Sequence, residues 1–160
     1  MFQERVANYE RESADLLRVQ ALLGHWATEP SSPCLTIAPA RVVDHAAAQN
    51  GNTGWLALRW YPALLLLYAG GIGAVTSGNY QNLNRLLSTC VSWPGTRGDA
   101  QPFVKAVIEG IADVADGFKA LPGHDRDYVP RSEYLFAFLR QPLDSVLSIG
   151  SDYERVFDDG

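Results

Sequence analysis

Four ionisable residues stand next to one another in the second half of the chain: His124, Asp125, Arg126 and Asp127. A histidine beside carboxylates can act as a general acid, a general base or a metal ligand. Catalysis, however, requires groups that converge on one reacting atom, and consecutive residues of a single loop seldom do so. The pattern therefore favours a solvated loop. A small enzyme that uses the His124 loop is kept as an alternative.

Other motifs of catalysis and cofactor binding are missing from the sequence. Residues 70–73 (GGIG) lack the lysine and hydroxyl of a phosphate-binding loop and do not follow a strand, so close helix contact is their expected role. There is no HExxH motif, no Cys/His spacing typical of zinc and no serine in a GxSxG elbow. We therefore predict no cofactor and no metal, and we favour a protein without catalytic activity.

One cation and a group of aromatic residues are candidates for binding a ligand or a partner. Arg59 stands at the mouth of the most apolar stretch, where it could pair with a buried carboxylate, cap a helix end or bind an anion. Trp55, Trp60, Tyr61 and Trp93 flank the same stretch, and such residues are enriched at protein interfaces. The alternative is that these aromatic residues complete a helical core, since tryptophan is often partly buried.

The composition indicates one folded domain in a reducing compartment. The chain has 160 residues, of which 47% are hydrophobic and 19% are charged, and this is enough to bury a sizeable core. A formal net charge of −5 and the absence of any basic run argue against nucleic acid as a partner. Cys34 and Cys90 are the only cysteines, which fits a cytoplasmic protein with two small buried thiols.

Residues 60–75 carry no charge, and such a segment belongs at the centre of the core of a soluble domain. We predict a helix over 54–77, in which Pro62 produces a kink or a restart because its ring clashes with the carbonyl of Leu58. A bilayer span needs roughly 20 apolar residues. This stretch is shorter and has no flanking Lys/Arg cluster. A membrane-associated protein that inserts residues 55–75 is therefore the less favoured alternative.

Periodic apolar residues predict further helices around this central one. They are expected over 2–27, 40–49, 80–90, 103–121 and 131–140, followed by a short segment that contains Tyr153, Val156 and Phe157. The predicted inward stripe of the first helix consists of Phe2, Val6, Tyr9, Leu16, Val19, Leu23 and Trp26. Together these elements predict an all-α fold, a single globular domain over 1–160 with about six helices. The abrupt first helix and the short last segment suggest an accessory module or fragment of a longer protein.

Two sets of residues resemble a known class of protein region. The first set is 59–72 (RWYPALLLLYAGGI), and the second combines 127–130 (DYVP), 134–136 (YLF), 142–143 (PL) and 153–157 (YERVF). Together they resemble the α-helical C-terminal region of large bacterial multidomain proteins that carry an effector or ATP-binding domain upstream. The shared motifs are structural. The resemblance therefore implies an accessory module joined to an upstream domain, and it assigns no catalytic residue.

These observations favour a non-catalytic regulatory or protein-interaction domain of a larger bacterial protein in the cytoplasm. The expected partner is a protein, in the first place the covalently linked upstream domain. A membrane is a partner only under the insertion alternative. The preference for arginine over lysine and the abundance of alanine fit a GC-rich bacterium. The residues expected to contact a ligand or partner are Arg59, Trp55, Trp60, Tyr61, Trp93 and His124.

Overall fold

The computed structural model describes residues 1–47, 53–92, 100–124, 126 and 128–159. Within these ranges the α-helices are α1 (Phe2–Trp26), α2 (Cys34–Ala47), α3 (Thr53–Leu58), α4 (Tyr61–Thr76), α5 (Tyr80–Ser88), α6 (Phe103–Gly110), α7 (Pro130–Leu147) and α8 (Tyr153–Asp159). The 3-10 helices η1 (Ala112–Ala120) and η2 (Gly150–Asp152) and the strands β1 (Cys90–Ser92) and β2 (Ala100–Pro102) complete the described elements.

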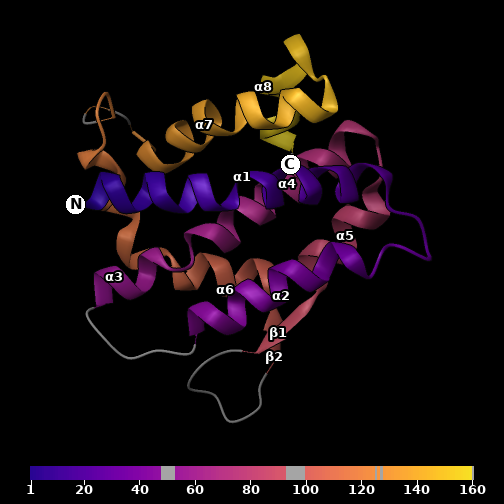
Figure 1. Ribbon diagram of the computed structural model, residues 1–160, viewed down its shortest axis with the longest axis horizontal. Coiled ribbons are helices and arrows are strands. Elements are labelled where there is room, and N and C mark those ends of the chain that lie inside the picture. Colours follow the sequence, from indigo (N-terminus) through magenta and orange to yellow (C-terminus); the bar gives the residue numbers. More distant parts are fainter. Residues whose placement is uncertain (48–52, 93–99, 125, 127, 160) are drawn as a thin grey trace.

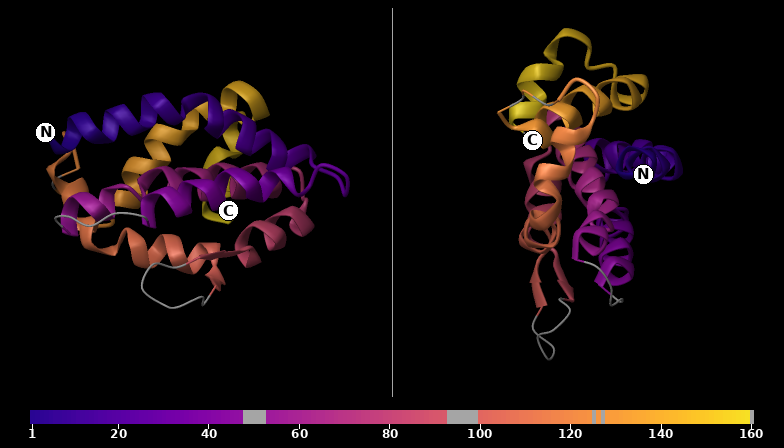
Figure 2. Two further views of the ribbon diagram at one scale, coloured as in Figure 1. Left: turned by 60° about the horizontal axis from the view of Figure 1, so that its bottom comes forward. Right: turned by 90° about the vertical axis from the view of Figure 1, so that its left-hand side faces the viewer.

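The helices are arranged around α1 and α4. Helices α7 and α8 lie on one side of this pair, and α2, α3 and α6 lie on the other side together with the strands (Figures 1 and 2). Strands β1 and β2 form an antiparallel pair in which Cys90 faces Pro102. The predicted all-α fold is confirmed, and this small hairpin is an element that the sequence pattern did not predict.

Helix α4 forms the centre of the core. All its residues except Pro62, Tyr68 and Thr76 are buried, and it contacts α1, α2 and α5–α8. The helix predicted over 54–77 is divided, because α3 ends at Leu58 and α4 begins at Tyr61. Pro62 lies in the first turn of α4, where its missing N–H has no partner to lose. The proline therefore causes a restart of the helix, one of the two expected outcomes.

The segment Gly54–Thr76 has the length and the composition of a membrane span. In this structure, 78% of its most apolar window is buried inside the protein. Burial of this kind is typical of a core helix. The protein itself therefore covers most of this apolar surface, and the insertion of residues 55–75 stays a prediction.

Helices α1 and α4 touch backbone to backbone. A Cβ atom added at Gly73 would lie 2.1 Å from the carbonyl oxygen of Ala21, and one added at Gly24 would lie 2.2 Å from the carbonyl oxygen of Gly70. No side chain fits at these distances, so the two helices can approach this closely only at glycine. The expected role of residues 70–73 in close helix contact is confirmed.

The C-terminal end of α1 is held by the α4–α5 hairpin. The last carbonyl groups of a helix have no partner within the helix and need one elsewhere. Asn82 of α5 is buried, and its Nδ2 donates to the carbonyl oxygens of Gly24 at 3.0 Å and Ala27 at 2.9 Å. Asn79 caps α5, since its side chain accepts a hydrogen bond from the backbone N–H of Asn82. The two asparagines thus join the end of α1 to the start of α5.

Helix α2 begins earlier than the sequence pattern predicted. It starts at Cys34 and continues through Pro39, whereas a helix was expected only from residue 40. A proline inside a helix leaves the carbonyl four residues earlier without its backbone donor. Here that carbonyl belongs to Leu35, and it accepts a hydrogen bond of 2.8 Å from Nε2 of the buried Gln20. A side chain of α1 thus makes the proline tolerable within α2.

Several other boundaries and environments also differ from expectation. The helix predicted over 103–121 is divided into α6 and η1, and the helix predicted over 131–140 continues through Pro142 to Leu147. Cys34 and Cys90 are exposed, so the prediction of two buried thiols is wrong. Cys34 is the first residue of α2 and Cys90 opens a two-stranded hairpin, and neither position faces the core.

Because α1 and α4 are in close contact at Gly73, we predict that the substitution Gly73→Ala lowers the free energy of unfolding. Helix propensity alone would raise the free energy of unfolding by about 1 kcal/mol. The added methyl group meets the backbone of Ala21, and we expect a net decrease of about 1–3 kcal/mol. Urea denaturation measures this difference. Ala137→Gly at an exposed position of α7 provides the reference for propensity, and a stabilised Gly73→Ala variant would contradict the close contact.

Candidate functional site

Two of the aromatic residues expected at an interface are buried in the core. Trp60 is 5% exposed and Tyr61 is fully buried. The Trp60 ring occupies the space beside Gly110, where a Cβ atom would lie 2.2 Å from the ring. These two residues complete the helical core and cannot present a surface to a partner, so the structure corrects the prediction for both. Trp93 lies outside the described residues.

Trp55 is half-buried, in α3, and its ring faces α1. The guanidinium carbon of Arg5 lies 4.4 Å from the centre of the ring, which is the geometry of a cation–π contact. The ring also lines a shallow hollow with Phe2 and Gly117. Trp55 therefore stays at the surface, but one side of its ring is already used to join α3 to α1.

Tyr61 takes part in a network of hydrogen bonds that joins three helices. Its hydroxyl donates to Oε1 of Glu10 in α1 at 2.7 Å, and the hydroxyl of Tyr134 in α7 also donates to this carboxylate. Burial raises the pKa of Glu10, and the two hydrogen bonds oppose this rise only in part. Burial also raises the pKa of both tyrosines, and the charge of Glu10 adds to that effect. Both hydroxyls therefore remain protonated donors.

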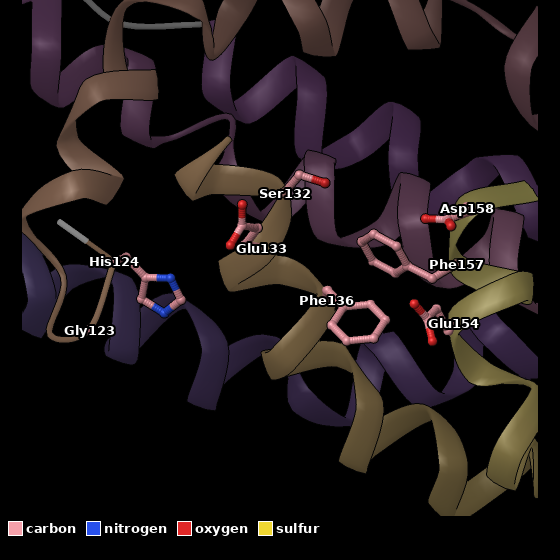
Figure 3. A pocket seen from close by; sticks show the side chains of 8 residues that line it. All are labelled: Gly123, His124, Ser132, Glu133, Phe136, Glu154, Phe157 and Asp158. Carbon is pink, nitrogen blue, oxygen red and sulfur yellow. The ribbon is translucent and has the colours of Figure 1, made fainter. Parts of the chain in front are cut away.

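His124 lines a pocket of about 410 Å³ between the loop before α7, α7 itself and α8. Figure 3 shows the rings of Phe136 and Phe157 lying between His124 on one side and Glu154 on the other. The His124 ring meets the ring of Tyr134 edge to face at 5.3 Å. The structure thus supplies a second and a third element beside His124, which the sequence did not reveal.

The ionisable residues that line the pocket beside His124 are all acidic: Glu133, Glu154 and Asp158. The described part of the chain contains no group of three His, Cys, Asp or Glu side chains that could hold a metal ion. The other carboxylates of the predicted cluster, Asp125 and Asp127, lie outside the described residues. The catalytic alternative therefore stays a prediction.

An apolar surface lies on the outer side of α1. We define the α1 apolar row as Val19, Leu22, Leu23 and Trp26, which line a groove of about 310 Å³ with Ala27 and Ser31. Trp26 is 70% exposed and Val19 is 50% exposed. The spacing of these residues, i, i+3, i+4 and i+7, brings them to one side of the helix.

Val19 and Trp26 belong to the stripe of α1 that was predicted to face the core, and the structure corrects this placement. The buried residues of α1 are Val6, Ser13, Leu17, Gln20, Ala21 and Gly24. Val19 lies two residues after Leu17, and Trp26 lies two residues after Gly24. Two residues correspond to a rotation of about 200° around a helix, so each lies opposite a buried residue. Both side chains therefore point away from α4. The available signal was Gly24, because a glycine inside a helix often marks the side of closest contact.

Arg59 lies in the turn between α3 and α4 and is partly buried. Its side chain lines a hollow with Arg41 and His45 of α2 and with Tyr9 of α1. Of the roles considered for Arg59, the ion pair is not found, because no carboxylate among the described residues pairs with it.

The raised pKa of Glu10 predicts how the stability of the protein depends on pH. Because the pKa of Glu10 in the folded protein lies above its ordinary value of 4.5, the contribution of this group to stability is fully present below pH 4.5. It is lost as pH rises through the folded-state pKa. Glu10→Gln stays neutral and keeps an acceptor for Tyr61. We therefore expect the variant to gain stability relative to the native protein as pH rises from about 4 towards neutral.

Urea denaturation across this pH range checks the expectation, with Glu4→Gln as the control for removing an exposed charge from the same helix. A stability difference between Glu10→Gln and the native protein that does not change with pH would contradict the raised pKa.

Comparison with known proteins identifies no relative. No protein-family model, no curated protein and no solved structure matches the chain. A function for this chain is therefore argued from the residues that its own fold brings together.

Proposed function

We propose that this chain is a non-catalytic protein-interaction domain, with a regulatory role, of a larger bacterial cytoplasmic protein. Its contact surface is the α1 apolar row. The single observation that carries the proposal is the exposure of Trp26, which is 70% accessible at the end of a row of apolar side chains. Composition and the sequence resemblance support the bacterial and cytoplasmic parts of the proposal.

The energetic argument rests on the area that Trp26 leaves in water. A tryptophan side chain can bury about 150–250 Å². At about 25 cal/mol per Å², covering the exposed part of this ring would contribute about 3 kcal/mol before the cost of association. Tryptophan is also among the residues that most often dominate binding energy. Trp26 is therefore the expected anchor of the contact.

The shape of the surface favours an amphipathic helix as the partner element. An apolar row on one helix with i, i+3, i+4 and i+7 spacing is complementary to a second helix of the same pattern. Arg18 and Asp15 form an ion pair of 2.9 Å beside the row, so the rim carries both signs of charge. We place the partner helix on a domain linked upstream in the same polypeptide, as the sequence resemblance implies.

Site-specific photo-crosslinking in the source cell tests this proposal. With p-benzoylphenylalanine at position 26, we expect a crosslink to one defined helix, which peptide mass spectrometry locates. Val19→Asp places a charge in the apolar contact and is expected to weaken it about tenfold or more, because apolar anchors tolerate no unpaired charge. Val19 is half exposed, so the fold should remain stable, and circular dichroism verifies this.

The same crosslinker at the exposed Ala137 of α7 is the matched control. Equal crosslinking from positions 26 and 137, or no effect of Val19→Asp, would show that the α1 apolar row is not the contact surface. A crosslink to a separate protein would agree with the interaction function. It would contradict the placement of the partner helix on a linked domain.

A further inference from the structure

The hollow beside Arg59, which is separate from the α1 apolar row, gathers basic residues from two parts of the chain. It has a volume of about 320 Å³ and is lined by Tyr9, Arg41, Val42, His45, Arg59 and Pro62. Arg41 and His45 are one turn apart and so share one side of α2. Arg59 reaches the same hollow from the turn between α3 and α4. Two arginines and a histidine thus line one small volume.

The charge of this hollow is opposite to that of the whole protein. The chain has a formal net charge of −5, yet no described residue that lines the hollow carries a carboxylate. Residues 48–52, which follow α2 in the sequence, include no aspartate or glutamate. Asp44 is an exposed neighbour in the sequence, and no ion pair joins it to Arg41 within the described ranges.

Arg59 has a donor that no described residue satisfies. Its Nη1 is buried and has no hydrogen-bond acceptor among the described residues. A buried donor on a charged group is costly unless an acceptor reaches it, and such groups in native proteins are usually met by protein, water or an ion. An arginine cannot lose its proton to avoid this cost. Arg59 therefore keeps its positive charge beside the hollow.

The lining also provides a place for an apolar group. The Tyr9 ring, Val42 and Pro62 form the rest of the wall, and the Tyr9 hydroxyl is a further donor. Guanidinium groups present paired N–H donors that match the oxygen atoms of phosphate. The volume lies at the lower end of the range for small-molecule pockets, so it suits a small ligand.

From these observations we infer that the hollow between α1, α2 and the start of α4 binds a small-molecule phosphate monoester. Arg41 and Arg59 hold the phosphate, His45 donates to it, and the organic group lies against Tyr9, Val42 and Pro62. This site goes beyond the proposed interaction function, because it uses none of the residues of the α1 apolar row.

Isothermal titration and thermal unfolding of the native protein test the site with phenyl phosphate as the probe. We expect phenyl phosphate to bind and to raise the unfolding temperature by several degrees at saturating concentration, relative to sodium chloride at the same ionic strength. Arg41→Gln removes an exposed guanidinium and is expected to weaken binding about ten- to hundredfold, the usual effect of losing a hydrogen bond to a charged group. Arg59→Lys, which keeps the charge and loses the paired donors, should weaken it about tenfold.

Arg155→Gln, on α8, removes one positive charge elsewhere and should leave the affinity within about twofold. Absence of binding by phenyl phosphate, or equal affinity in Arg41→Gln and the native protein, would overturn the site. Equally tight binding of benzoate would overturn the preference for phosphate. Binding to vesicles that contain phosphatidic acid, without binding of phenyl phosphate, would overturn the small-molecule ligand in favour of a lipid headgroup.

Discussion

The backbone contact between α1 and α4 is the constraint on which the rest of this structure depends. Gly24 and Gly73 allow each helix to lie directly against carbonyl groups of the other. Interhelical distance is set by the side chains at the contact, so glycine gives the shortest approach. The remaining helices then cover the other sides of α4, whose surface is apolar all round.

This constraint also decides which side of α1 faces outwards. Had α1 turned its bulky side chains towards α4, Val19 and Trp26 would have entered the core and the two backbones would have been held apart. The glycine contact selects the opposite orientation and leaves Val19 and Trp26 in solvent. The proposed interaction surface thus results from the way the core is assembled. No further helix or strand is required to form it.

Polar side chains connect the helices at places where apolar contact alone would leave backbone groups unsatisfied. Gln20 supplies the donor that Pro39 lacks, and Asn82 satisfies carbonyl groups at the end of α1. Glu10 receives hydrogen bonds from two tyrosines of other helices. Unpartnered buried atoms also occur among the described residues, and they include Oε1 of Gln20 and Nη1 of Arg59. The ligand is inferred at Arg59 because Arg41 and His45 line the same hollow.

The fold class and the central helix follow from the sequence, because long apolar segments act through local rules. Pro62 indicated either a kink or a restart, and the structure shows the restart. The sequence also indicated close contact at residues 70–73. Tertiary structure alone decided which arc of α1 is buried, since Phe2, Val6, Tyr9, Leu16, Val19, Leu23 and Trp26 form a plausible stripe until the glycines of two distant helices meet. It likewise decided that Trp60 and Tyr61 are core residues and that Arg41 and Arg59 share one hollow. Such proximities join residues far apart in the chain, and no local spacing encodes them.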